Sequence, residues 1–190
     1  MRLRSLLLAA AAMLAASPAA ASPEAPPPLP FDIGGPFALV DQEGRARTER
    51  ALEGTPSLLF FGYAQCRSIC TVALPRMAET VDLLEEAGLD VRPVLVTIDP
   101  GRDTSAALRE AAPRIHPRLL ALTGSEEALA AARRAYRVEI ERIGEDIEGP
   151  IYAHGSFVYL LDDEGRFLTL LPPVLGPERM AEIATTYLKP

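Results

Sequence analysis

The fold is decided between residues 57 and 70, where the sequence reads SLLFFGYAQCRSIC. The run 57–61 is short and dominated by leucine and phenylalanine, which is typical of a strand buried on both faces of a sheet, and Gly62 ends it. A helical pattern follows over about 67–86, and Gly88 is its expected end. Its apolar stripe is expected to contain Val72, Met77, Val81 and Leu84. The segment therefore predicts a central strand that turns directly into a helix.

The rest of the chain alternates between the same two kinds of element. Strands are expected at 37–40, 91–98, 119–122, 157–161 and 167–171. Helices are expected at 104–112, after a cap at Ser125, and at 177–188, and a polar, hairpin-like stretch occupies 138–150. This order predicts an α/β fold: a mixed central sheet flanked by helices, with an added N-terminal hairpin and a late one.

The amino terminus has the pattern of an export signal. Arg2 and Arg4 precede an uncharged apolar run over 6–16, and small residues follow up to Ala21. We expect a signal peptide at 1–21, with an uncleaved membrane anchor as the alternative, then a proline-rich tether at 22–30 and one folded domain at 31–190. The domain is thus expected to be exported, either periplasmic or anchored in a membrane and facing the periplasm.

Charge and cysteine content exclude several classes of protein. The 190 residues include 26 acidic and 19 basic side chains, for a net charge of −7, which argues against nucleic acid as a partner. Two cysteines cannot form a four-thiolate zinc site or a disulfide framework. Outside the cytoplasm two thiols pair unless they are held reduced or bind a metal. The cysteines therefore matter as one pair.

That pair, Cys66 and Cys70, lies where the central strand gives way to the helix. A helix amino terminus favours the thiolate form of cysteine. On a regular helix residues i and i+4 have Cβ atoms about 5–6 Å apart, wider than a relaxed disulfide. A metal between the sulfurs tolerates the wider spacing. The pair could thus be a redox couple or a metal site. A purely structural disulfide is the third alternative, although so short a loop would stabilise the fold by only about 2 kcal/mol.

A third ligand can be sought among the two histidines. His154 directly precedes the expected strand 157–161, in a loop that we expect beside the cysteine strand. His116 lies between Arg114 and Arg118, and we expect it to be solvated. Two thiolates and one imidazole suit copper, and zinc remains chemically reasonable. These residues alone indicate a thioredoxin-like or related α/β domain with a redox or copper site.

Four ordered segments resemble the Sco/SenC family. They are Phe60–Cys70, Val96–Thr104, Leu122–Gly124 and His154–Asp162, and the resemblance extends over about 31–188. It implies a thioredoxin-like copper protein, exported or membrane-anchored, that assists the assembly of cytochrome c oxidase. Two positions depart from the family pattern: Thr71 replaces a frequent proline, and Ala153 replaces a frequent acidic residue.

The resemblance also implies residue roles. Cys66, Cys70 and His154 would bind copper, as Cu(I), Cu(II) or both, and the cysteines would form a disulfide when oxidised. Asp99 would lie near the metal without binding it. The expected function is a copper metallochaperone, which is not an enzyme, whose partner is the copper-bearing subunit of cytochrome c oxidase or another copper chaperone. The alternative is a thiol–disulfide oxidoreductase that uses the same cysteine pair.

Overall fold

A computed structural model describes residues 32–64, 70–147 and 149–189, without the side chains of Cys70, Thr71 and Asp146. The expected signal peptide and tether lie outside this range and stay predictions. Chain contacts separate residues 1–31 from residues 32–190. The second unit holds all of the described residues. No helix among its described residues has the length and apolar character needed to cross a membrane.

Nine strands and four α-helices occur in the described ranges. The strands are β1 (Ala38–Asp41), β2 (Ala46–Thr48), β3 (Ser57–Gly62), β4 (Arg92–Thr97), β5 (Leu120–Thr123), β6 (Ile140–Asp146), β7 (Gly149–His154), β8 (Val158–Leu161) and β9 (Phe167–Leu171). The helices are α1 (Cys70–Glu86), α2 (Ser105–Ile115), α3 (Glu126–Ala135) and α4 (Pro177–Leu188). Short 3₁₀ turns occupy Glu49–Leu52 and Pro173–Leu175.

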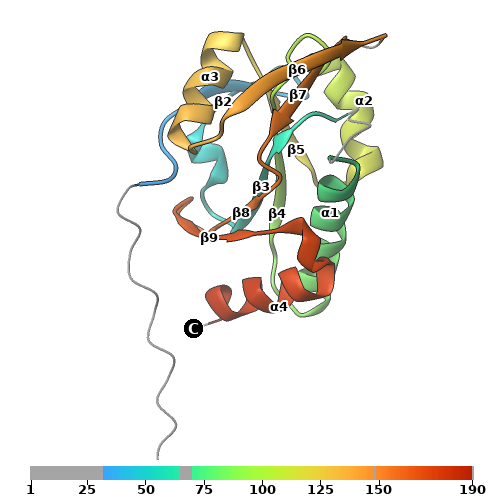
Figure 1. Ribbon diagram of the computed structural model, residues 1–190. Coiled ribbons are helices and arrows are strands. Elements are labelled where there is room, and N and C mark those ends of the chain that lie inside the picture. Colours follow the sequence, from blue (N-terminus) through green and yellow to red (C-terminus); the bar gives the residue numbers. More distant parts are fainter. Residues whose placement is uncertain (1–31, 65–69, 148, 190) are drawn as a thin grey trace, which may run out of the picture. The chain divides into compact units, whose positions relative to one another are not determined.

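Seven strands form one mixed sheet in the order β2-β1-β5-β4-β3-β8-β9. The pairs β3–β4 and β4–β5 are parallel, while β1, β8 and β9 run antiparallel to their neighbours. Helix α1 contacts β3 and β4, and α4 contacts α1 and β9; α2 lies against β5, and α3 lies against β1 (Figure 1). The predicted fold class is confirmed, including the N-terminal hairpin β1–β2 and the late hairpin β6–β7.

Strand β3 lies at the centre of the core. All six of its residues are buried, which explains why its sequence is almost continuously apolar rather than alternating. It pairs with β4 on one side and β8 on the other, so that Phe60 is opposite both Leu95 and Val158. The expectation that the strand after His154 adjoins the cysteine strand is therefore confirmed.

Helix α1 differs from its prediction in its first turn. Met77, Val81 and Leu84 are fully buried, but Val72 is 40% exposed. Val72 precedes Met77 by five residues, which is about 140° around a helix with 3.6 residues per turn. Ala73 and Leu74 take the inward positions instead. Helix α2 also continues past its expected end at residue 112, to Ile115.

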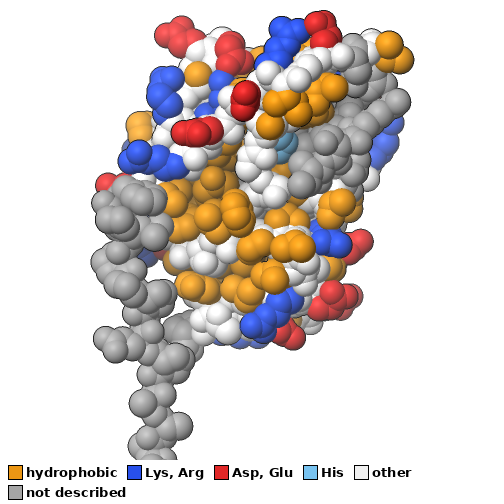
Figure 2. Space-filling view, viewed as in Figure 1, with side chains coloured by type: hydrophobic (Ala, Val, Ile, Leu, Met, Phe, Trp, Pro, Cys, Tyr) orange, Lys and Arg blue, Asp and Glu red, His pale blue; other side chains and the backbone are white. Residues whose placement is uncertain are grey.

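Strand β9 forms one edge of the sheet. Its side chains are half-buried except for that of Leu171, and Phe167, Leu168 and Leu170 pack partly against the core. Figure 2 shows hydrophobic side chains gathered over β8 and β9 on this face. The hairpin β6–β7, in contrast, is a separate two-stranded sheet that lies near the carboxyl end of β3 (Figure 1).

Candidate metal centre

The carboxyl end of β3 leads toward the cysteine motif. Tyr63, directly after the strand, is 4% exposed, and the backbone N–H of Ala64 donates a hydrogen bond of 2.9 Å to the carboxylate of Asp103. Cys66 lies outside the described residues. Cys70 is described only through its backbone, as the first residue of α1. The described residues thus include both ends of the segment that carries the cysteine motif, Ala64 on one side and the backbone of Cys70 on the other.

His154 approaches this connection from another part of the chain. It is the last residue of β7, so the prediction that it lies in a loop is wrong; the hydrogen bonds with β6 extend to it, and Ile140 is its partner. The half-buried imidazole lies with its ring centroid 5.9 Å from that of Phe60 and 6.3 Å from that of Tyr63. The imidazole is therefore at the end of β3 from which the cysteine motif starts.

Gly62 leaves room for the ring of Phe60, against which the imidazole of His154 lies. A Cβ atom at this position would lie 2.3 Å from the ring of Phe60, far inside contact distance. Phe60 is fully buried, so its ring cannot move aside without disturbing the core. A glycine at position 62 thus allows the Phe60 ring to lie where it meets His154.

The hydrogen bond of His154 determines its tautomer. Nδ1 lies 2.9 Å from the carbonyl oxygen of Gly155. Because a carbonyl can only accept, Nδ1 carries the hydrogen, and the lone pair of the neutral ring is on Nε2. Burial lowers the pKa of His154 from its ordinary value of 6.5, which outweighs the opposing effect of the Gly155 hydrogen bond. Both effects of this environment, a neutral ring and a fixed tautomer, suit a metal ligand.

Asp99, the candidate for a role near the metal, is 4% exposed and bound to an arginine. Nε of Arg102 lies 2.5 Å from Oδ2 of Asp99, and the backbone N–H of Arg102 donates to Oδ1 at 3.3 Å. The expectation that Asp99 lies near a metal stays a prediction. What the described residues show is that its carboxylate orients Arg102.

Asp103 connects the same loop to Thr97, the last residue of β4, and to Ala64, two residues after β3. Its Oδ2 accepts hydrogen bonds from the backbone of Ala64 and from the hydroxyl of Thr97, the latter at 2.8 Å. Its other oxygen, Oδ1, is buried and has no hydrogen-bond partner among the residues that the structure describes. Burial raises the pKa of Asp103, and its hydrogen bonds oppose this shift. Its role is to fix the backbone just before the cysteine motif.

The prediction that His116 is solvated is wrong. His116 is 5% exposed, its Nδ1 accepts the backbone N–H of Arg118 at 3.1 Å, and its Nε2 lies 3.2 Å from Oδ1 of Asp82. Arg118 extends outward and forms ion pairs with Glu85 and Asp90. The imidazole of His116, in contrast, is buried. His116 is therefore a structural histidine.

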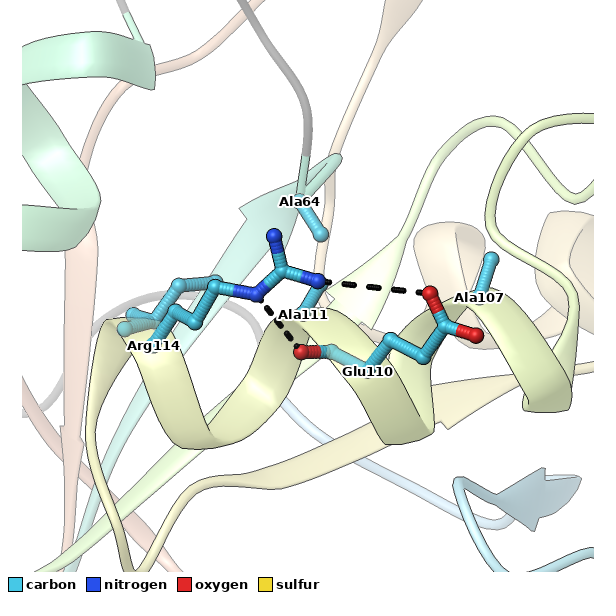
Figure 3. Close-up of a pocket in the computed structure, with 6 residues that line it drawn as sticks. Ala64, Ala107, Glu110, Ala111 and Arg114 are labelled. Atoms are coloured by element: carbon cyan, nitrogen blue, oxygen red, sulfur yellow. Dashed lines mark hydrogen bonds and ion pairs between the residues drawn. The ribbon is translucent and has the colours of Figure 1, made fainter.

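A hollow of about 420 Å³ lies between Ala64 and helix α2. It is lined by Ala64, Ala107, Glu110, Ala111, Arg114 and Ile115. Figure 3 shows the Arg114 side chain lying along the helix toward Glu110, with its Nε 3.0 Å from the Glu110 carbonyl oxygen. Among the described lining residues there is no thiol, imidazole or buried carboxylate.

Of the predicted site residues, the structure brings His154 to the end of β3. Asp99 binds Arg102, whose guanidinium lies over the ring of Tyr63. Among the described residues, no cluster of three or more His, Cys, Asp or Glu side chains could hold a metal ion. A set made of Cys66, Cys70 and His154 is not tested by that finding, because the described residues include neither cysteine side chain. The ligand set stays a prediction.

Sequence reasoning missed four residues around the candidate site. The rings of Phe60 and Tyr63 lie near the imidazole, Arg102 links Tyr63 to Pro150, and Asp103 binds the backbone of Ala64. All four lie in the two segments, Phe60–Cys70 and Val96–Thr104, that carried the family resemblance. The i,i+3 spacing of Asp99 and Arg102 could have indicated their ion pair. Nothing local indicated that Tyr63 and His154 meet.

The central strand that turns into a helix through a cysteine pair, within a mixed sheet with helices around it, defines a thioredoxin-like domain. Comparison with known proteins supports this class. A ScoI protein from Arabidopsis thaliana, solved with copper bound, is 32% identical, with a TM-score of 0.78 over 82% of this chain and 97% of that one. A ScoI protein from Bradyrhizobium japonicum, also solved with copper bound, is 32% identical, with a TM-score of 0.72 over 82% and 99% of the two chains.

The same comparisons identify the family. Residues 26–189 match the SCO1/SenC family. An SCO2-like protein from Rickettsia conorii is 38% identical over 152 residues, which cover 79% of this chain and 74% of that protein. The chain belongs to the SCO1/SenC family, as its four sequence segments predicted.

Proposed function

We propose that this protein is an exported copper metallochaperone that binds one copper ion through Cys66, Cys70 and His154. Copper is its cargo. The observation that carries the proposal is the position of His154, whose ring packs on Phe60 and Tyr63 at the end of the strand that leads into the cysteine motif. Two related proteins were solved with copper bound, which supports the choice of metal.

The donor set fits copper chemically. Thiolates favour Cu(I), and imidazole binds copper in either oxidation state. Cys70 is the first residue of α1, where the helix dipole favours the thiolate. The Gly155 carbonyl holds the hydrogen of His154 on Nδ1, so Nε2 is the nitrogen that would bind the metal.

The proposed acceptor is the copper-bearing subunit of cytochrome c oxidase, or another copper chaperone, on the outer side of the membrane. Transfer requires the ligands of the two proteins to exchange at the metal. Two thiolates and one imidazole leave room for an incoming ligand, because three ligands do not complete a tetrahedral site. The acceptor and the exported location follow from the family resemblance and from the expected signal peptide.

The test measures copper bound to the reduced protein under anaerobic conditions, in competition with a Cu(I) chelator. We expect about one copper per chain for the wild type, loss of tight binding in Cys66→Ser and Cys70→Ser, and an affinity lower by about tenfold or more in His154→Ala. His116→Gln, which removes the other imidazole, is the matched control and should bind like the wild type. Unchanged stoichiometry and affinity in all three ligand variants would contradict the proposal.

A second function, thiol–disulfide oxidoreductase, is favoured by the same helix position of Cys70. One thiolate would attack a substrate disulfide to form a mixed disulfide, and the second would displace the reduced substrate, leaving Cys66 and Cys70 oxidised. The imidazole distinguishes the two functions. Disulfide exchange should keep most of its rate in His154→Ala, whereas copper transfer should not.

A further inference from the structure

The position of His154 depends on how the hairpin β6–β7 is attached. The hairpin forms a sheet of its own, and a two-stranded hairpin is only marginally stable alone in water. Ile140 and Tyr152 pack partly against the core, but Ile143 is 62% exposed and Ile147 is fully exposed. Apolar packing at one end of the hairpin is thus modest, and polar contacts have to complete its docking.

Arg102 supplies such contacts from outside the hairpin. Its Nη2 lies 2.6 Å from the carbonyl oxygen of Pro150 in β7, and Cζ lies 4.7 Å from the centre of the Tyr63 ring. Its Nε is held by Asp99. One guanidinium thus joins three segments that are far apart in the sequence: the end of β3, the loop after β4, and the strand that ends in His154.

The loop that carries Arg102 is itself well fixed. The Asp99 backbone N–H donates to the hydroxyl of Thr97 at 3.0 Å, and the same hydroxyl donates to Asp103. The Arg102 side chain is only 20% exposed, so its ion pair with Asp99 is partly shielded from water. A planar guanidinium can pair through Nε, donate through Nη2 and stack on an aromatic ring at once, which a lysine ammonium cannot do.

We propose that Arg102 is a positioning residue of the copper site: it holds the His154 strand against Tyr63, at the point where the cysteine motif begins. The inference rests on the proposed function, because it assigns a role toward the same copper ion. It goes further in naming a residue that touches no metal and yet determines whether the imidazole can reach it. Asp99 acts one step further away, by orienting Arg102.

The expected consequence of losing Arg102 is selective. Cys66 and Cys70 belong to a segment of the chain other than the hairpin, so we expect Cu(I) binding through sulfur to persist. The imidazole contribution should weaken, because the strand that delivers it is no longer fixed at Pro150. Binding of Cu(II), which makes more use of nitrogen ligands, should therefore fall more than binding of Cu(I).

The test compares Arg102→Gln and Arg102→Lys with Arg166→Gln. Arg166 is the matched control, because its Nε pairs with Oδ2 of Asp162 at 2.8 Å in the turn of the other hairpin, β8–β9. Two readouts are used: hydrogen exchange of the β6–β7 amides in the metal-free protein, and the imidazole nitrogen couplings in pulsed EPR of the Cu(II)-loaded protein. A thermal melt of each variant verifies that it is folded.

We expect β6–β7 amides to exchange at least about tenfold faster in Arg102→Gln, because a hydrogen bond from a charged group is lost, while β8–β9 amides keep their rates. The imidazole couplings should be lost or strongly reduced in both Arg102 variants and retained in Arg166→Gln. Wild-type exchange rates and couplings in Arg102→Gln would overturn the inference alone. Absence of imidazole couplings in the wild type would instead contradict the proposed ligand set.

Discussion

His116 is buried in the turn after α2, whereas His154 ends a hairpin that is outside the main sheet. Nδ1 of His116 accepts a backbone hydrogen bond, so its hydrogen is on Nε2 and faces Asp82. Nδ1 of His154 donates instead, which leaves the lone pair on Nε2. The two rings are thus held as opposite tautomers, one buried in a turn and the other lying near Phe60 and Tyr63 at the end of β3.

The two histidines thus differ in role: His116 is structural, and His154 is the proposed copper ligand. A structural histidine has both nitrogens bound within the protein and lies inside well-packed surroundings. His154, the proposed copper ligand, has Nδ1 held by a carbonyl oxygen and ends a hairpin outside the main sheet, in which Ile143 and Ile147 are exposed. Separate measurements of stability and ionisation test this contrast between the two histidines.

The largest expected effect is on stability. His116→Ala should lower the free energy of unfolding by about 2–4 kcal/mol, because it opens a buried space and leaves the Arg118 N–H without its acceptor. Urea unfolding of the reduced, metal-free protein at neutral pH measures this loss.

His154→Ala provides the comparison within the same experiment. Its ring is half-buried and its hydrogen bond is local, so the loss should be about 1 kcal/mol or less. If His154→Ala were the more destabilising variant, the assignment of the two histidines to structure and function would be reversed.

A smaller effect concerns the protonation of His154. Burial lowers its pKa, so the ring of the metal-free protein should titrate with a midpoint below 6.5 in an NMR titration of its ring protons. Between that midpoint and 6.5 the unfolded chain binds more protons than the folded one, so this histidine reduces stability as the pH falls through the window. A midpoint at or above 6.5 would show that the ring is not shielded by Phe60 and Tyr63.

Much of the fold could be predicted because its determinants are local. The run 57–61 became β3, and the expected strand 167–171 and helix 177–188 match β9 and α4. Apolar runs bounded by glycine and proline specify such elements directly. The order of strands and helices then restricted the sheet to a mixed one.

The surroundings of the candidate site could not be predicted in the same way. The flanking arginines made His116 look exposed, yet the turn directs the arginine at 118 outward and the imidazole inward. The contacts of Arg102 join Tyr63, Asp99 and Pro150, and only the tertiary structure brings these together. Cys66, Cys70 and His154 were selected by residue chemistry and family resemblance, which do not report on such contacts.

The central claim is that two sulfurs and one imidazole bind the same copper ion. Copper K-edge X-ray absorption of the protein loaded with one copper per chain tests it directly. We predict scattering from two sulfurs and one imidazole in the wild type, with the imidazole contribution lost in His154→Ala and retained in His116→Gln. A wild-type spectrum that shows no imidazole, or one that His154→Ala leaves unchanged, would contradict the account.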